Sequence, residues 1–153
     1  MPHRPQTDRI EETFELRAPL DRVWRAISDH REFGAWFGVG IDRPFEKEVE
    51  STGRMTVAGY EHVRWRATIA AIQPTKRFAF TWRPYAIDPK KDYEDEIPTL
   101  VEFLLTDAAG ATRVVIRESG FDMTPAVRRA EAFRMNKAGW AAQRENLRRY
   151  VEG

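Results

Sequence analysis

The chain has 153 residues, with 25 Lys and Arg against 24 Asp and Glu, and no cysteine. This length suffices for one domain with its own core, and the lack of cysteine excludes disulfides and thiolate metal sites. The net charge of +1 gives no basis for nucleic-acid binding, and no apolar run approaches the roughly 20 residues that a membrane span requires. Aromatic residues are abundant, with nine Phe, five Trp and four Tyr. We therefore expect a cytoplasmic domain with an aromatic core.

The start of the chain differs from the rest. Residues 1–8 are polar, contain prolines and have no apolar stretch behind them. The sequence therefore predicts a disordered tail here and not a signal peptide. We expect residues 9–153 to form a single ligand-binding domain. Its first strand is indicated by the segment from Ile10 to Leu16, where a mainly apolar face alternates with a polar one.

Two short helices are expected after this strand. Pro19 suits the first turn of a helix over residues 19–28, because its ring fixes φ near the helical value. Ser28 and Asp29 form an N-cap signal for a second helix, which Gly38 would end. That second helix carries three aromatic residues, Phe33, Trp36 and Phe37.

Residues 41–119 have the pattern of successive antiparallel strands joined by short connections. The clearest strand is residues 63–71, where apolar and polar side chains alternate. A longer connection, residues 83–98, contains five acidic residues. Its length exceeds that of a usual hairpin loop and is typical of either a gate or a passive insertion. We expect strands at residues 45–49, 54–57, 63–71, 78–82, 101–105 and 114–116, with a turn at residues 51–53.

A long helix is expected at the C-terminal end. Thr124 is predicted to cap it, Pro125 suits its first turn, and about 26 residues, roughly 40 Å of helix, follow. Phe133, Trp140 and Leu147 recur every seven residues and form an apolar stripe. The other face indicates either a solvated surface or a surface for a protein partner or an anionic membrane. It carries Arg128, Arg129, Arg134, Arg144, Arg148 and Arg149.

This order of elements predicts an α+β helix-grip fold. A curved antiparallel sheet of about six or seven strands would wrap around the long C-terminal helix. The two short helices after the first strand would close one end. Such an arrangement commonly leaves a cavity between its layers, in which an apolar ligand could lie.

Several short motifs, in this order along residues 9–151, carry a family resemblance. They are Ala18-Pro19 followed by Val23-Trp24, Trp36-Phe37-Gly38, Thr112 to Ile116, Ser119-Gly120-Phe121, and Gly139-Trp140 with Leu147 and Tyr150. With them, the sequence resembles the bacterial proteins similar to the activator of the 90-kDa heat-shock protein ATPase, in the START-like, birch-pollen-allergen-like (SRPBCC) superfamily. The resemblance implies a ligand-binding cavity. It implies no single reaction, because the superfamily includes lipid carriers, cyclases, dehydratases and chaperone activators, and a shared fold does not carry a shared function.

The chain offers few residues for metal or cofactor chemistry. Its three histidines, His3, His30 and His62, do not stand at the spacing of metal ligands. The sequence contains no Gly-x-Ser-x-Gly nucleophile elbow and no glycine-rich phosphate loop. We therefore predict no metal site and no cofactor, and we assign no catalytic residue.

Two carboxylates stand out because they share otherwise apolar strand faces. Glu12 belongs to the first strand and Glu118 to the last. A carboxylate facing a cavity could orient a polar group of a ligand, or act as a general acid or base if burial raised its pKa. Alternatively, each could reach solvent or pair with an arginine. The candidate partners are Arg66, Arg113 and Arg117.

The aromatic residues of neighbouring strands and of the long helix are either ordinary core or the wall of a pocket. As pocket lining we predict Trp65, Phe80, Trp82, Phe103, Phe133 and Trp140, with Glu118 as the polar anchor. As a gate we predict Trp36, Phe37 and Tyr85.

These features lead to three functional hypotheses. The first is binding of a small hydrophobic or amphipathic ligand between the sheet and the long helix. The second is an enzyme of the cyclase, dehydratase or hydrolase type, in which Tyr60 or Arg64 would assist Glu118. The third is an interaction module that modulates a chaperone or another protein through the arginine face of the last helix. The candidate partners besides a small ligand are therefore another protein or, as a homodimer, a second copy of the chain.

Overall fold

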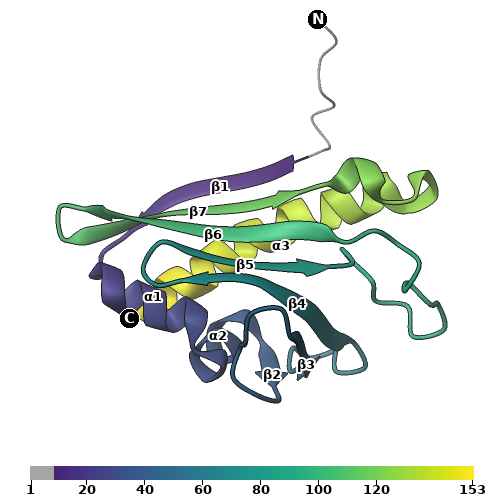
Figure 1. The fold of residues 1–153 in the computed structure, drawn as a ribbon, viewed down its shortest axis with the longest axis horizontal. Helices are drawn as coiled ribbons and strands as arrows, with labels where there is room; N and C mark the ends of the chain where they lie inside the picture. Colours follow the sequence, from purple (N-terminus) through teal and green to yellow (C-terminus); the bar gives the residue numbers. More distant parts are fainter. Residues whose placement is uncertain (1–8) are drawn as a thin grey trace, which may run out of the picture.

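A computed structural model describes residues 9–153 of the chain. The tail expected at residues 1–8 lies outside the described residues. Figure 1 shows the elements in chain order. They are β1 (Arg9–Leu16), α1 (Leu20–Ser28), α2 (His30–Phe37), β2 (Val39–Ile41), β3 (Glu50–Met55), β4 (Arg64–Gln73), β5 (Arg77–Trp82), β6 (Thr99–Ala108), β7 (Ala111–Ser119), the 3-10 turn η1 (Phe121–Met123) and α3 (Ala126–Glu152).

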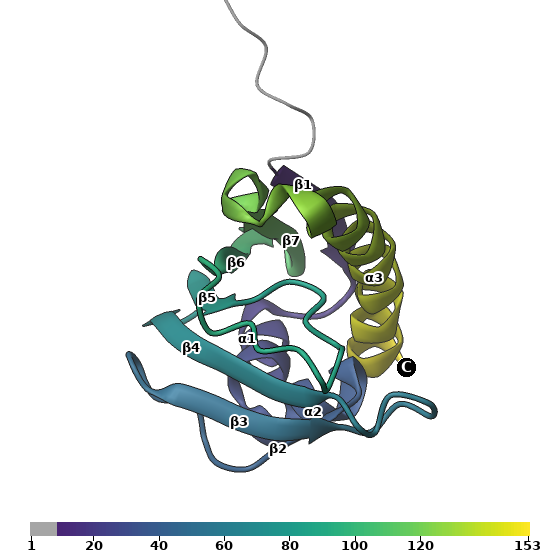
Figure 2. The same cartoon turned by 90° about the vertical axis from the view of Figure 1, so that its right-hand side faces the viewer.

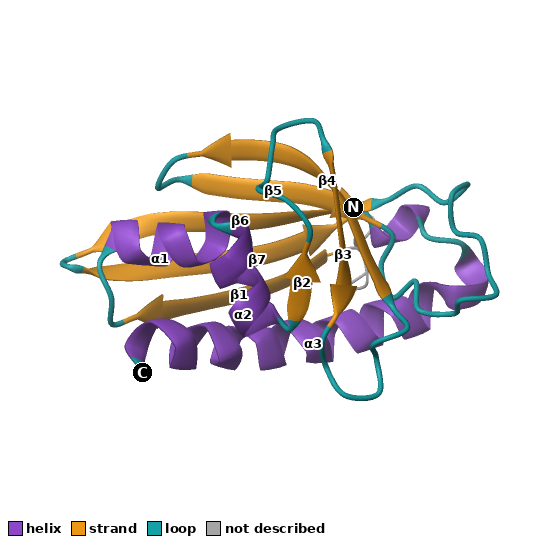
Figure 3. Ribbon diagram, turned by 90° about the horizontal axis from the view of Figure 1, so that it is seen from below, coloured by secondary structure: helices purple, strands orange, loops and turns teal. Residues whose placement is uncertain are grey.

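The seven strands form one sheet in the order β1-β7-β6-β5-β4-β3-β2, and all neighbours pair antiparallel. The sheet curves around α3, which crosses its concave side (Figures 1 and 2). Figure 3 shows α1 and α2 on the same face of the sheet, with α1 beside the C-terminal end of α3. The predicted α+β helix-grip fold is confirmed.

The core is built around the ring of Phe33 on α2, which is fully buried. Its ring centroid lies 4.9 Å from that of Trp36 and 5.0 Å from that of Phe37, and the strand residue Trp65 lies 5.6 Å away. The Phe33 and Trp36 rings meet edge to face, an arrangement that the ring quadrupoles favour, whereas the Phe33 and Phe37 rings are stacked. The Trp36 indole N–H donates to the Ala26 carbonyl at 2.8 Å and so joins α2 to α1.

The boundaries of α2 confirm the signals read from the sequence. The Asp29 side chain accepts hydrogen bonds from the backbone N–H groups of Arg31 and Glu32, at 2.9 and 3.1 Å, which satisfies donors at the helix start. Gly38 ends the helix with a φ of 92°, a left-handed conformation that favours glycine.

The region before β4 differs from the prediction. Residues 45–49 are a loop and not a strand, and residues 51–53 lie within β3 instead of forming a turn. A short strand that the pattern did not predict, β2, pairs with the end of β3. The reason is a close backbone approach: a Cβ at Gly53 would lie 2.3 Å from the carbonyl oxygen of Gly40. Glycine here permits strand pairing and does not mark a turn.

The predicted cap of the long helix is also wrong. Pro125 is the residue that precedes α3, and the Thr124 hydroxyl makes no cap. This hydroxyl is buried and finds no hydrogen-bond partner among residues 9–153. The Thr124 carbonyl instead accepts from the Arg129 guanidinium at 3.1 and 3.0 Å. Within residues 9–153, no helix combines the length and apolar composition needed to cross a bilayer.

Candidate functional site

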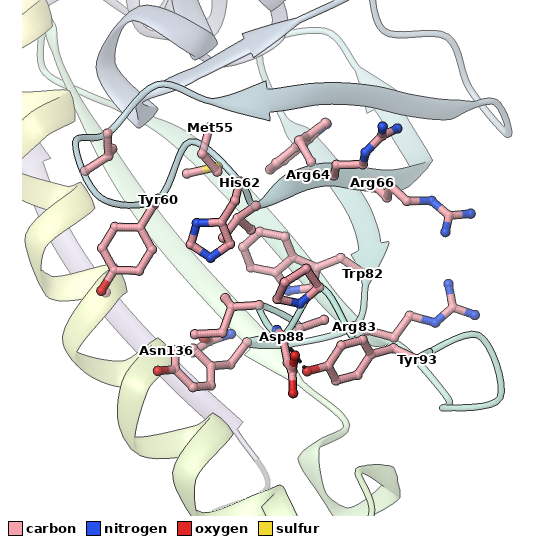
Figure 4. Close-up of a pocket in the computed structure, with 18 of the residues that line it drawn as sticks. Met55, Tyr60, His62, Arg64, Arg66, Trp82, Arg83, Asp88, Tyr93 and Asn136 are labelled. Atoms are coloured by element: carbon pink, nitrogen blue, oxygen red, sulfur yellow. Dashed lines mark hydrogen bonds between the residues drawn. The ribbon is translucent and has the colours of Figure 1, made fainter. Parts of the chain in front are cut away.

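A cavity of about 780 Å³ opens between the sheet and α3 (Figure 4). Its walls come from α3, from the start of β4, from the connection between β3 and β4, and from residues 83–98. The helix contributes residues spaced three and four apart, which places them on one face. These are Asn136, Gly139, Trp140, Ala142, Gln143 and Asn146.

One side of the cavity is an aromatic wall, which we define as Phe37, Trp65, Trp82 and Trp140. The ring centroids of Trp65 and Trp82 lie 5.6 Å apart, and those of Trp82 and Trp140 lie 5.8 Å apart. The rings of Phe37 and Trp65 meet edge to face, with their centroids 5.5 Å apart. Trp65 and Trp140 are only 2% and 3% exposed, so they present ring edges, whereas Trp82 is half-buried and presents more of its surface. The wall is therefore rigid and apolar.

Glu118 lies directly behind this wall and is 0% exposed. One carboxylate oxygen accepts from the Trp82 indole N–H at 2.8 Å and from the Thr99 hydroxyl at 2.6 Å. The other accepts from the Trp140 indole N–H at 2.8 Å and from the Asn136 amide at 2.9 Å. Both oxygens are occupied, and the carboxylate locks two indoles of the wall in place.

All four donors to Glu118 are neutral, and no cation among residues 9–153 pairs with it to compensate its burial. Burial raises the pKa of the Glu118 carboxyl above its ordinary value, although the bonds from Thr99, Trp140, Trp82 and Asn136 act in the opposite direction. The cost of desolvating the charge exceeds the gain from hydrogen bonding to it.

The cavity surface also carries polar side chains that have no hydrogen-bond partner in the part of the chain that the structure describes. Figure 4 shows the His62 imidazole projecting into the cavity, with Tyr60 on the α3 side. Tyr60 is 44% exposed, and His62 and Arg64 are also exposed. Arg66 is instead engaged by two carboxylates, those of Glu50 and Glu94. The rim of the cavity is thus polar and exposed to solvent, while its deeper part is aromatic.

The long connection, residues 83–98, forms the wall opposite β4 and is fastened at its base. Arg128 of α3 pairs with the Glu96 carboxylate, with Nε to Oε2 at 2.8 Å, and donates to the Pro84 carbonyl at 2.7 Å. Its guanidinium also lies 4.9 Å from the ring centroid of Tyr93. Because Arg128 and Glu96 are 11% and 9% exposed, this pair is a largely buried attachment between the connection and the helix.

The predicted lining residues separate into two groups. Trp65, Trp82 and Trp140 line the cavity. Phe80 and Phe103 are fully buried in the core between sheet and helices and do not contribute to the lining. The remaining lining candidate, Phe133, packs against Phe121 near the start of α3, with ring centroids 5.2 Å apart.

The three residues predicted as a gate do not lie together, and neither do the two carboxylates, Glu12 and Glu118. Phe37 and Tyr85 line the cavity, whereas Trp36 is buried beneath α1. Glu12 pairs with Arg144 of α3, with Oε1 to Nη1 at 3.0 Å. It therefore joins β1 to the helix and lies away from the cavity. Its partner is none of the three arginines named from the sequence.

Of the cavity residues on α3, the sequence indicated Trp140 but not its neighbours on the same face, among them Asn136, Gly139 and Gln143. The signal was available, because they occupy one face of α3 beside Trp140 at helical spacing. The apolar stripe of Phe133, Trp140 and Leu147 indicated a neighbouring face of the helix instead. Within the described residues, no group of three or more His, Cys, Asp or Glu is placed to hold a metal ion.

The fold and the cavity define a helix-grip domain of the START-like, birch-pollen-allergen-like class. Residues 17–152 match the family model described as "Activator of Hsp90 ATPase homolog 1-like protein". The chain therefore belongs to this family, and the resemblance read from the motifs is confirmed. A search among curated proteins finds no match.

Solved structures share this fold. DynU16, a protein of the dynemicin biosynthetic locus, is 25% identical with a TM-score of 0.71; the match covers 95% of this chain but only 47% of DynU16. The chain thus spans about half the length of that protein. Protein MLL2253 from Mesorhizobium loti is 22% identical with a TM-score of 0.73, and the match covers 94% of this chain and 96% of MLL2253. CalU16 from Micromonospora echinospora is 17% identical with a TM-score of 0.66, over 94% of this chain and 75% of CalU16.

Proposed function

We propose that this protein binds a small hydrophobic or amphipathic molecule in the cavity between the sheet and α3. The observation that carries the proposal is the aromatic wall in a cavity of about 780 Å³. This volume lies within the range of roughly 300–1,000 Å³ that is usual for sites of small molecules. Indole surfaces give a flat apolar ligand a large contact area at a small entropic cost.

The site has the layout expected for an amphipathic ligand. An apolar body would pack against Trp82 and the edges of Trp65 and Trp140, while polar substituents would reach the rim near Tyr60 and His62. The relation to DynU16 supports a small-molecule context, since that protein comes from the biosynthetic locus of dynemicin. We keep the cytoplasmic location and the single domain over residues 9–153 as parts of this proposal.

The enzymatic alternative has less support from the geometry. A general acid or base must reach the reacting group directly or through one water. Glu118 does not line the cavity, and both of its oxygens are occupied by donors from the wall. The proposal is therefore binding without a chemical step at Glu118.

The interaction-module alternative rests on the arginines of α3, and most of these are engaged within the chain. Arg128 binds Glu96, Arg144 binds Glu12, and Arg148 binds the Glu15 carbonyl at 3.1 Å. Their hydrogen bonds and charges are already used in holding the helix to the sheet and to the long connection. A protein partner or a second copy of the chain would have to compete with these contacts.

Thermal-shift measurements with lipids, flavonoids and aromatic acids test the proposal. A ligand at a hundredfold excess over its Kd stabilises the folded state by about 2.7 kcal/mol. We expect at least one of these classes to raise the melting temperature of the wild-type protein.

Gly139 offers a blocking variant that keeps the fold. A Cβ at this position meets nothing within 4 Å, and glycine inside a helix costs about 0.5–1 kcal/mol relative to alanine. Gly139→Ala should therefore be more stable than the wild type and still bind. Gly139→Phe should fold with an undiminished melting temperature but lose the ligand-induced shift, because its ring occupies the cavity. The proposal fails if no compound shifts the wild type, or if Gly139→Phe responds as strongly as the wild type.

A further inference from the structure

Asn136 presents a hydrogen-bond acceptor to the cavity in a fixed orientation. Its Nδ2 donates to Oε1 of Glu118 at 2.9 Å, beside the Trp140 indole N–H that donates to the same oxygen at 2.8 Å. Reversing the amide would place the Asn136 oxygen against an oxygen that already serves as an acceptor. The network of Glu118 therefore turns Oδ1 of Asn136 away from the carboxylate.

This oxygen is unoccupied and accessible. No donor within residues 9–153 bonds Oδ1 of Asn136, and it is not among the buried unpaired atoms, of which the described residues contain one, the Thr124 hydroxyl. Asn136 also lines the cavity from α3, as Figure 4 shows. A ligand in the cavity can therefore donate a hydrogen bond to Oδ1.

The other amides of the cavity surface are already engaged. Gln143 donates through Nε2 to the Phe37 carbonyl at 2.9 Å and accepts through Oε1 from Asn146 at 3.1 Å. The exposed Tyr60 and His62 exchange any ligand hydrogen bond for one with water, so they discriminate little between ligands. Asn136 is half-buried next to the aromatic wall, where an acceptor left without a donor costs more.

We propose that Asn136 is the specificity-determining residue of the cavity and selects aromatic ligands that carry a hydrogen-bond donor, such as a phenolic hydroxyl or a ring N–H. This inference rests on the proposed function and names the class of ligand. Glu118 is a positioning residue in this scheme: it touches no ligand, but it fixes the orientation of the Asn136 amide and of the Trp82 and Trp140 indoles.

Calorimetric titrations with 2-naphthol and 2-methoxynaphthalene test the inference. The two compounds share one ring system, and only the first carries a donor. We expect the wild-type protein to bind 2-naphthol about tenfold more tightly, which corresponds to about 1.4 kcal/mol. Asn136→Leu, which removes the acceptor at a similar side-chain size, should bring the ratio of the two Kd values close to one.

Gln143→Leu is the matched control. It removes an amide from the same helix face, but one whose two ends are engaged within the chain. It should change the affinities for both compounds alike and keep their ratio. The wild-type comparison requires no variant and therefore does not depend on the folding of Asn136→Leu.

Two results would overturn the inference alone: equal binding of the two compounds by the wild type, or an undiminished preference for 2-naphthol in Asn136→Leu. If neither compound bound to the wild type, and no lipid, flavonoid or aromatic acid did so in the thermal-shift measurements, the proposed function would be overturned together with the inference.

Discussion

Glu118 illustrates how burial and hydrogen bonding compete at one carboxylate. Within the described part of the chain the charge has no cation beside it, and two of its four donors are indole N–H groups, which can only donate. These bonds satisfy the ionised form, whereas burial favours the neutral form. Burial prevails, so the folded protein holds a proton on Glu118 at a higher pH than the unfolded chain does.

This balance predicts a pH-dependent difference between the wild type and Glu118→Gln. Because the folded-state pKa of Glu118 is raised, its contribution to stability is fully present below the unfolded-state pKa and is lost as the pH rises through the folded-state value. The free energy of unfolding of the wild type relative to Glu118→Gln should therefore fall as the pH is raised from below the unfolded-state pKa of Glu118 into the alkaline range. Urea unfolding of both proteins across this range measures it. A difference that grows with pH would show that the four hydrogen bonds prevail over burial.

At the scale of single residues, the sequence predicted which way the Glu118 side chain points but not which residues donate hydrogen bonds to it. Period-two alternation placed Glu118 on the inward face of its strand with Val114 and Ile116, and the structure confirms that all three are buried. Its donors come from β5, β6 and α3. Which of these side chains meet depends on the strand register and on the rotation of α3, and neither can be read from local spacing.

At the scale of elements, α3 has three roles along its length. Leu147, near its C-terminal end, is fully buried, whereas the middle, from Asn136 to Asn146, faces the cavity. The first turn holds residues 83–98 through Arg128. The Arg128 guanidinium lowers the pKa of the Glu96 carboxyl below its ordinary value, mainly by hydrogen bonding. The stability that Glu96 contributes is therefore present above its unfolded-state pKa and is lost as the pH falls through the folded-state value.

Removing this attachment should loosen residues 83–98. Arg128→Met leaves the Glu96 carboxylate largely buried without its main partner, which should destabilise the protein by about 3 kcal/mol. Hydrogen exchange followed by mass spectrometry should show faster exchange in residues 83–98, with β4 protected as before. Arg128→Lys keeps the charge but loses the forked geometry of the guanidinium. Its stability and its exchange in residues 83–98 should therefore lie between those of the wild type and those of Arg128→Met. Unchanged exchange in residues 83–98 would contradict the role assigned to Arg128.

Elements with strong periodicity were predictable, and elements defined by backbone approach were not. The alternation in residues 63–71 predicted β4 to within two residues at each end. In contrast, the pairing of β2 with β3 depends on the absence of a side chain at Gly53, which lets the Gly40 carbonyl approach, and a pattern of apolar residues does not register this. A glycine can mark a turn or permit a close backbone approach, and the position of the neighbouring strand determines which of these occurs.

At the scale of the whole molecule, the order of elements was sufficient to predict the fold, because a curved sheet has few ways to cover its apolar face. The cavity was predicted as a kind of site, but only part of its surface was identified. Phe80 shares a face of β5 with Trp82, which lines the cavity, and Phe103 lies on the neighbouring β6, yet both are fully buried in the core. Residues 55–63, between β3 and β4, supply lining that has no periodic signal.

The central claim is that a small aromatic ligand lies against the aromatic wall, and the five tryptophans test it directly. In ¹⁵N–¹H correlation spectra each indole N–H gives its own signal, which Trp→Phe variants assign. Titration with 2-naphthol should shift the signals of Trp65, Trp82 and Trp140, which line the cavity, and leave those of Trp24 and Trp36 in place. Equal shifts at all five, or shifts confined to Trp24 and Trp36, would contradict the account.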